Sequence, residues 1–320
     1  MAATNNVLPV TLDQIRTARD RIAPYVHRTP LLASRSISEI AGLEVRLKCE
    51  NLQRSGSFKL RGAMNALLQL SDEERRRGVV AFSSGNHAQG VALSAKILGI
   101  HATIVMPEGS VRAKVEATRS YGAEVVQSGV NEATRGDIAH EIAAKRGASV
   151  IPPFDDERII AGAGTTGLEI VEEWPEVRSI VVPVGGGGLI SGIAIAATES
   201  DRSIRVHGVE PAAGDDARQS LEKGEIVRID PPKTIADGAR TLAIGERNFA
   251  IMRDRLAGIV TVDDDELLYA LKLAIYRTKL LIEATGALGL AALLRRKLTL
   301  VPPVAVVVSG GNLDYSLLCR

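Results

Sequence analysis

Short, almost continuously apolar runs alternate along the chain with stretches in which apolar residues recur at helical spacing. Such runs are typical of parallel strands that are covered on both faces. Near the start, Thr11 and Gln14 fit a capping box, and Val10 with Ile15 fits the flanking hydrophobic staple, so we expect a helix from about Thr11. The alternation predicts an α/β fold with parallel sheets and right-handed crossovers. The predicted strands are Glu44–Cys49, Val79–Phe82, Ala102–Met106, Glu124–Gln127, Ser179–Val184, Arg205–Glu210, Ile259–Val262 and Val304–Val308.

The composition is that of an ordinary globular protein. A length of 320 residues allows two domains, and the pair Pro152–Pro153 marks a plausible seam between them. The formal net charge is +1 with acids and bases mixed, which predicts neither a nucleic-acid surface nor a polybasic membrane patch. No apolar stretch approaches the ~20 residues of a membrane span, and the start MAATNNVLPV lacks a secretory signal. We therefore expect a cytoplasmic protein.

A glycine-rich loop follows one of the predicted strands. Gly185, Gly186, Gly187 and Gly188 lie between the strand SIVVPV and the helix-like run LISGIAIAA. A strand, a flexible loop and a helix N-terminus together form an anion site, because free N–H groups and the positive dipole end face the ligand. The spacing fits neither the Walker A motif nor the dinucleotide fingerprint. The loop therefore predicts a single phosphate monoester, although a plain flexible turn would also contain glycines.

Two further segments carry candidate chemistry. Lys59 begins a helical pattern after Gly56, Ser57 and Phe58. An arbitrary lysine is usually solvated, but a desolvated lysine beside another cation becomes a nucleophile, and Arg61 is near it in sequence. The loop SSGNHAQG follows the strand VVAF and precedes a helix, which suits a carboxylate. Its histidine has no carboxylate partner nearby in sequence and is more often a capping or packing residue.

Together these residues resemble the serine racemase and threonine dehydratase branch of fold type II pyridoxal-phosphate enzymes. The shared motifs are GSFKLRG, SSGNHAQG, VPVGGGGLISG and SGGN, in family order, and the similarity runs from about Thr11 to Asp314. The resemblance implies two open, twisted, mostly parallel α/β domains with the cofactor in the cleft between them. It assigns residues 1–52 and 154–320 to a large cofactor-binding domain and residues 53–153 to a small domain with the asparagine loop. It also implies a homodimer.

The resemblance then assigns roles to individual cofactor-binding residues. Lys59 matches the lysine that bonds covalently to pyridoxal phosphate, and Phe58 matches the aromatic side chain beside the ring. Gly185, Gly186, Gly187 and Gly188 match the phosphate-binding loop. Asn86 matches the contact to the cofactor 3-hydroxyl, and Ser309 the partner of the pyridine nitrogen. A serine at that position leaves the ring nitrogen largely neutral, which disfavours a long-lived carbanion and suits elimination.

Substrate and metal ligands are implied in the same way. Ser83, Asn86 and His87 match the loop that binds the substrate carboxylate. Arg135 lies where relatives place a substrate-contacting arginine, although a solvated helix arginine fits the sequence equally well. Glu210, the main-chain carbonyl of Gly214, and Asp216 match a site for Mg²⁺, or for Ca²⁺ or Mn²⁺, and hard oxygen ligands suit such cations. From composition alone, Asp215 and Asp216 are an acidic helix start.

The activity implied is a dehydratase that converts L-threonine, L-serine or a similar 3-hydroxy amino acid to a 2-oxo acid and ammonia. Ser84 supplies an alternative, because racemases carry serine there and many dedicated threonine dehydratases carry alanine. Lys59 and Ser84 are then the two catalytic acid–base groups of a racemase. Elimination from 3-hydroxyaspartate is a further alternative. A nucleotide-dependent oxidoreductase would need a dinucleotide fingerprint, and a non-catalytic binding protein on this fold would be expected to lack Lys59.

Overall fold

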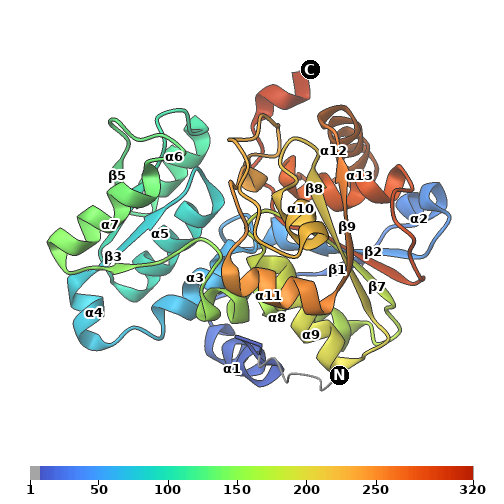
Figure 1. The fold of residues 1–320 in the computed structure, drawn as a ribbon, viewed down its shortest axis with the longest axis horizontal. Coiled ribbons are helices and arrows are strands. Elements are labelled where there is room, and N and C mark those ends of the chain that lie inside the picture. Colours follow the sequence, from blue (N-terminus) through green and yellow to red (C-terminus); the bar gives the residue numbers. More distant parts are fainter. Residues whose placement is uncertain (1–7, 320) are drawn as a thin grey trace.

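The computed structural model describes residues 8–319 and contains two sheets that lie side by side (Figure 1). Residues 1–7, on which the expectation about a secretory signal depends, and Arg320 lie outside the described part. The larger sheet has the strand order β1-β2-β10-β7-β8-β9, and the smaller has the order β5-β4-β3-β6. The strands of the larger sheet, in that order, are Leu31–Ala33, Val45–Cys49, Val304–Val308, Ser179–Pro183, Arg205–Pro211 and Leu256–Val262. Those of the smaller are Glu124–Val126, Ala102–Val105, Val79–Phe82 and Ser149–Val150.

The helices connect and cover these strands. The first seven are α1 Leu12–Ile22, α2 Arg35–Ala41, α3 Lys59–Leu67, α4 Asp72–Arg77, α5 Asn86–Leu98, α6 Arg112–Ser120 and α7 Arg135–Arg146. The others are α8 Glu157–Glu173, α9 Gly188–Ser200, α10 Asp216–Lys223, α11 Glu246–Arg255, α12 Asp264–Thr278 and α13 Leu288–Leu294. Short 3₁₀ helices occupy Glu50–Leu52, Asp237–Ala239, Thr285–Ala287 and Tyr315–Cys319. Within residues 8–319, no helix combines the length and apolar character needed to cross a membrane.

The predicted α/β fold with mostly parallel sheets is confirmed. Among the described strand pairs, only β1 with β2 is antiparallel. All eight predicted strands are present, and β9 begins earlier than predicted, at Leu256. The two strands that the sequence did not indicate, β1 and β6, are three and two residues long. Such short strands show no period of their own and are strands only because a neighbour pairs with them.

The start of α1 follows the sequence closely. Thr11 is the N-cap, and both hydrogen bonds of the capping box with Gln14 are present. Val10 and Ile15 are fully buried in one apolar cluster. The predicted capping box and hydrophobic staple therefore fix where this helix begins.

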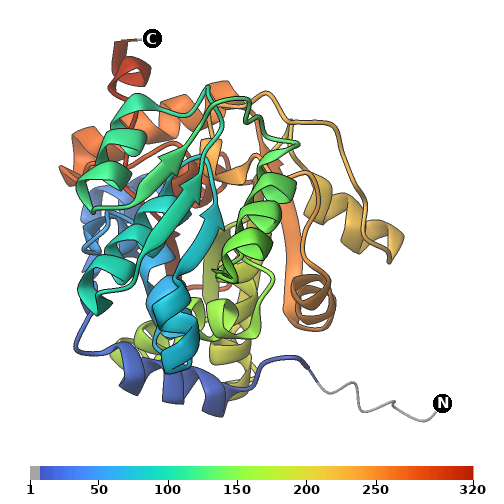
Figure 2. The same ribbon diagram turned by 90° about the vertical axis from the view of Figure 1, so that its left-hand side faces the viewer.

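Helices cover both faces of the smaller sheet. Along β3, Val79 and Ala81 pack into the cluster beneath α5, whereas Val80 and Phe82 pack into the cluster beneath α7. Figure 2 shows the smaller α/β unit from its outer side, with its strands between teal helices on the left and a green helix on the right. Because successive strand residues point to opposite faces, a continuously apolar strand needs cover on both.

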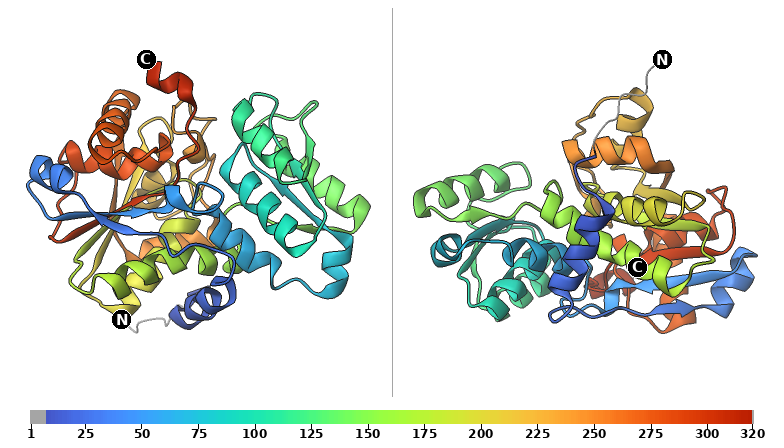
Figure 3. Two further views of the ribbon diagram at one scale, coloured as in Figure 1. Left: turned by 180° about the vertical axis from the view of Figure 1, so that it is seen from behind. Right: turned by 90° about the horizontal axis from the view of Figure 1, so that it is seen from below.

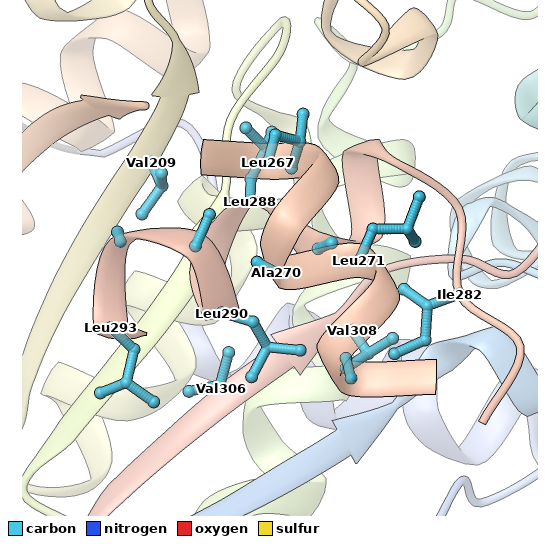
Figure 4. Packing of buried hydrophobic residues seen from close by; sticks show 14 of the residues in the cluster. Val209, Leu267, Ala270, Leu271, Ile282, Leu288, Leu290, Leu293, Val306 and Val308 are labelled. Carbon is cyan, nitrogen blue, oxygen red and sulfur yellow. The ribbon is translucent and has the colours of Figure 1, made fainter. Parts of the chain in front are cut away.

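The larger sheet is covered in the same way. Figure 4 shows α12 and α13 packing on one face, where Leu267, Leu271 and Leu290 meet Val306 and Val308 of the central strand β10. The alternate residues of β10, Ala305 and Val307, pack into the cluster on the opposite face, which contains residues of α8 and α9. The central strands are thereby held rigidly, and so are the loops that leave their carboxyl ends.

Two segments join the sheets. The chain leaves β2 of the larger sheet through α3, and it returns from β6 through the Pro152–Pro153 pair to α8. All four strands of the smaller sheet lie within the stretch 53–153. Helix α3 packs against α5 on one side and α8 on the other, and α1 packs against α8 beneath this junction (Figure 3).

Candidate active site

One pocket lies between the two sheets and brings the predicted cofactor and substrate residues together. It encloses about 900 Å³, including the part that is open to solvent. Both sheets contribute to it through loops at the carboxyl ends of their strands, as expected for ligand sites of open α/β sheets. The residues assigned from the sequence that line it are Phe58, Lys59, Ser83, Ser84, Asn86, His87, Arg135, Gly185, Gly186, Gly187, Gly188 and Ser309.

The tetraglycine loop is packed so tightly that side chains are excluded. A Cβ on Gly186 would lie 2.2 Å from Cδ1 of Phe154, and a Cβ on Gly185 would lie 2.9 Å from the Gly238 carbonyl oxygen. Gly187 has φ +93°, a conformation that favours glycine. Helix α9 starts at Gly188, and the first turn of a helix leaves N–H groups without intrahelical acceptors. The loop therefore forms a backbone cradle of the shape and polarity that a phosphate monoester needs.

We expect Gly186→Ala to weaken pyridoxal phosphate binding by about 5- to 150-fold, because an added methyl in a full site costs about 1–3 kcal/mol. The check is a spectroscopic titration of the apo-protein with pyridoxal phosphate. Gly109→Ala is the matched control, because a Cβ there has no atom within 4 Å. Equal affinities of the two variants would contradict the assignment of the cradle.

Lys59 is placed as a reactive amine at the first position of α3. Its ammonium group donates to the main-chain oxygen of Pro153 over 2.7 Å and lies 5.1 Å from the ring centroid of Phe58. Burial, assisted by the positive charge of Arg135, lowers the pKa of Lys59 to about 8. At pH 7 roughly a tenth of the molecules therefore carry the neutral amine, far more than for a solvated lysine, and this is the form that a nucleophile or general base requires.

The cation beside Lys59 is not the one that the sequence suggested. Arg61 points away from the pocket into a fully buried ion network with Glu50, Glu169 and Lys48. Its guanidinium donates to both oxygens of Glu50, each over 2.8 Å. Burial alone would raise the pKa of Glu50, but Arg61 outweighs burial and lowers it. Arg61 thus anchors the first turn of α3 in the core, two residues after Lys59.

The asparagine loop is fixed by hydrogen bonds rather than by its sequence alone. Asn86 donates to Glu283 over 2.5 Å and accepts from Asn312 over 2.9 Å, so the orientation of its amide is set from both ends.

His87 contacts the Ile151 carbonyl through Nε2 over 3.0 Å. Burial, with the charge of Lys59, lowers the pKa of His87 to about 3. The imidazole is therefore neutral, which fits a packing and hydrogen-bonding role and not that of a cation or general base.

Arg135 and Ser309 complete the pocket from opposite sides. Arg135 begins α7 and donates to Ser84 Oγ over 2.6 Å, so it is not a solvated surface arginine. Ser309 directly follows β10, is buried, and accepts a main-chain hydrogen bond from Phe58 over 3.1 Å. That bond ties the end of the central strand to the residue that precedes Lys59.

Sequence reasoning missed a buried acid–base pair in this pocket. Glu283 accepts from Lys114 over 3.0 Å, and Lys114 also donates to Asp237 over 2.5 Å. Burial raises the pKa of Glu283, and Asp237 adds to the rise although Lys114 opposes it. A signal existed, because Glu283 is the single charge in the apolar run LLIEATGALGLAALL. Its partners could not be inferred, since they come from distant segments.

The implied metal ligands lie near the end of β8 and in the loop and helix start that follow it. Glu210 near the end of β8 accepts from the main-chain N–H groups of Ala217 over 3.0 Å and Arg218 over 2.8 Å. Burial and the nearby Asp216 raise the pKa of Glu210 well above its usual range, and burial raises that of Asp216 to about 7. Asp216 Oδ2 is buried without a hydrogen-bond partner. Asp215 accepts hydrogen bonds from the side chains of Arg218 and Gln219 in the first turn of α10. Stabilisation of the helix start therefore explains the acidic residue at 215 but not the one at 216.

The metal assignment therefore depends on two carboxylates and a main-chain oxygen. Residues 8–319 contain no cluster of three or more His, Cys, Asp or Glu side chains that could hold a metal. Two buried carboxylates with raised pKa values and one unpartnered oxygen nevertheless form a donor set that a hard divalent cation would satisfy.

The fold and the pocket define an enzyme that holds a phosphorylated cofactor between two α/β units, with a reactive lysine beside it. The family model described as "Pyridoxal-phosphate dependent enzyme" matches residues 22–310, and the chain belongs to that family. The resemblance and the fold class inferred from the sequence are thereby confirmed.

Named relatives cover almost the whole chain. An L-threo-3-hydroxyaspartate ammonia-lyase of Saccharomyces cerevisiae is 47% identical over 305 residues, covering 95% of this chain and 94% of the relative. A serine racemase of Schizosaccharomyces pombe is 45% identical over 311 residues, covering 97% and 96%. Among solved structures, a threonine deaminase of T.th. matches with a TM-score of 0.91 and 47% identity, covering 95% of this chain and 99% of that one.

The residues of this chain fit pyridoxal phosphate. The cradle that a Cβ would fill lies in the same pocket as the Lys59 amine and the Ser309 hydroxyl. When bound, the cofactor supplies an electron sink for the α-carbon of an amino acid. The protein supplies the cradle, the amine and the polar groups that orient both partners.

Proposed function

We propose that this protein eliminates water from L-serine, L-threonine or a similar 3-hydroxy amino acid, and that hydrolysis of the released imine then gives the corresponding 2-oxo acid and ammonia. The observation that carries the proposal is the buried Lys59 amine, with a pKa of about 8, in one pocket with the tetraglycine cradle and Ser309. The three relatives named above support it, because each acts on a small hydroxy-amino acid or is named for one.

In this proposal the residues around the pocket have different roles. The N-terminal loop of α5, with Ser83, Asn86 and His87, receives the substrate carboxylate through N–H groups and the helix dipole. The neutral amine of Lys59 takes the α-proton. The Lys59 ammonium formed in this way can deliver a proton to the β-hydroxyl, which then leaves as water as its C–O bond breaks. Ser309 offers a neutral partner to the ring nitrogen, which suits elimination rather than a long-lived carbanion.

Racemisation is the second candidate, and Ser84 is the observation that favours it. Ser84 lines the same pocket as Lys59, and a hydroxyl that turned to give its proton to the α-carbon would complete racemisation. Elimination from 3-hydroxyaspartate is supported by the yeast relative and by Arg135 and Arg240, two cations lining the pocket.

The proposal is tested by incubating the purified protein with L-serine, pyridoxal phosphate and Mg²⁺ and analysing for pyruvate and, by chiral chromatography, D-serine. Pyruvate with little D-serine is the expected result. Substantial D-serine would make racemisation the principal activity. If L-serine gives neither product, L-threonine and 3-hydroxyaspartate are tested next, and no product from any of the three refutes the proposal.

We also propose that Glu210, the carbonyl of Gly214, and Asp216 bind Mg²⁺ or Ca²⁺. At a concentration one hundred times the dissociation constant, the bound ion should stabilise the fold by about 2.7 kcal/mol. Thermal unfolding with and without the ion measures this. Asp216→Asn should abolish the stabilisation, whereas Asp215→Asn, at the neighbouring carboxylate, should retain it. Stabilisation that survives Asp216→Asn would place the ion elsewhere.

A homodimer is part of the same proposal and depends on the resemblance. Large apolar side chains, including Tyr276 at 68% exposure, remain on the surface of the single chain. Analytical ultracentrifugation at micromolar concentration should give twice the 34.0 kDa chain mass.

A further inference from the structure

Three polar side chains of the smaller α/β unit, those of Ser84, Glu132 and Arg135, each contact the other two at the edge of the pocket. Ser84 Oγ lies 2.7 Å from Glu132 Oε1 and 2.6 Å from Arg135 Nη1. Glu132 and Arg135 are themselves in ion-pair contact. Ser84 and Arg135 line the pocket, whereas Glu132 is not among the residues that line it. Glu132 has no role in the proposed elimination.

The chemistry of these groups determines where the hydroxyl hydrogen lies. A guanidinium can only donate, and an ionised carboxylate can only accept. Ser84 must therefore accept from Arg135 and donate to Glu132, so its single hydrogen points away from the pocket. The side of the Ser84 oxygen that faces the pocket therefore carries no hydrogen. It can accept a proton there but cannot donate one.

This orientation affects the two candidate reactions differently. Elimination from an L-amino acid requires Lys59 to take the α-proton and requires nothing from Ser84. Racemisation requires, in addition, that the Ser84 O–H bond breaks and its proton forms the new bond at the α-carbon. The hydroxyl would first have to turn away from Glu132, and the alkoxide formed would then lie beside a carboxylate.

We infer that Glu132 is a positioning residue that holds the Ser84 hydroxyl hydrogen out of the pocket and so directs the enzyme toward elimination rather than racemisation. This inference rests on the proposed function and identifies what sets the ratio of its two outcomes. Arg135 opposes Glu132 in part, because its positive charge would stabilise the alkoxide. Glu132 is therefore the member of the trio whose removal should favour D-product.

The test measures the ratio of D-serine to pyruvate formed from L-serine by the holoenzyme. Glu132→Gln makes the acceptor neutral, and Glu132→Ala removes it. Because a hydrogen bond to a charged group is typically worth at least a tenfold change in an equilibrium, we expect the ratio to rise about tenfold in both variants, with pyruvate still formed. Glu141→Gln, on the exposed side of α7 where Glu141 pairs with Lys145, is the matched control and should leave the ratio unchanged.

A double variant distinguishes positioning of the Ser84 hydroxyl by Glu132 from a general structural effect of losing Glu132. With Ser84→Ala in place, adding Glu132→Gln should leave the ratio where Ser84→Ala alone puts it. An unchanged or lower ratio in both Glu132 variants overturns the inference, as does a ratio that still rises without Ser84. Loss of pyruvate formation in both variants overturns it too, since elimination should not need Glu132.

These outcomes are distinct from failure of the proposed function. A wild-type enzyme that uses L-threonine instead of L-serine allows the same ratio to be taken with the threonine products. Wild-type protein that forms no 2-oxo acid from serine, threonine or 3-hydroxyaspartate refutes the proposed function itself. Wild-type activity with an unmoved ratio refutes only the role of Glu132.

Discussion

Lys59→Ala should reduce 2-oxo acid formation at least about 10³-fold, because it removes the group that both holds the cofactor covalently and takes the α-proton. The purified variant should also lose the yellow colour of the wild-type holoenzyme. Release of 2-oxo acid and visible absorbance spectra measure the two effects. Alanine leaves the remaining lining residues in place, so the cradle should still bind the phosphate, but reversibly.

Two comparisons make this prediction specific. Lys145→Ala removes an exposed lysine of α7 and should change neither colour nor activity. Lys59→Arg keeps a positive charge but cannot supply a neutral amine, since arginine stays protonated in proteins, and should be as inactive as the alanine variant. Wild-type activity in either Lys59 variant would rule out the proposed chemistry.

Arg61→Ala should lower the free energy of unfolding by about 3–5 kcal/mol, because it leaves two buried carboxylates without their main partner. Arg61 bonds to Glu50 and Glu169, and all three side chains are almost completely buried. Lys48 donates to Glu169 over 2.6 Å and acts on Glu50 only through a charge effect smaller than that of Arg61, so Glu50 loses its main counter-ion. Urea unfolding of the apo-protein, followed by circular dichroism, measures the change.

The contrast with a surface pair isolates the effect of burial. Arg112 bonds to Glu116 one turn away on α6, and the arginine side chain is 90% exposed. Arg112→Ala should cost less than about 1 kcal/mol, as is usual for exposed ion pairs. Similar losses in the two variants would show that the buried network does not stabilise the protein as its geometry suggests.

The parts of the site that could be predicted from the sequence are those that one continuous segment of the chain forms by itself. The tetraglycine loop and the asparagine loop each lie between a strand and a helix that the apolar pattern already indicated, so their place at the sheet edge followed. The contacts of Arg61 could not be predicted, because Glu169 is 108 residues away. Lys114 and Glu283 are 169 residues apart and show no shared pattern.

Glu132 shows the same limit on a smaller scale. It precedes α7 and meets Ser84 across 48 residues, at the edge of a sheet whose register decides the contact. The sequence marks Arg135 and Ser84 through the family resemblance but gives no reason to single out Glu132. Only the positions of the three side chains together reveal which way the hydroxyl points.

The strand order also has a consequence for biosynthesis. β2, residues 45–49, pairs with β10, residues 304–308, and Ser309 follows β10. On the ribosome, the smaller sheet has all its strands once residue 150 has emerged, whereas β2 must wait, with that edge unpaired, until almost the whole chain is made. An unpaired apolar edge invites aggregation, and such non-local pairings form slowly. The nascent chain therefore has a long interval in which it cannot retain its cofactor and is most in need of a chaperone.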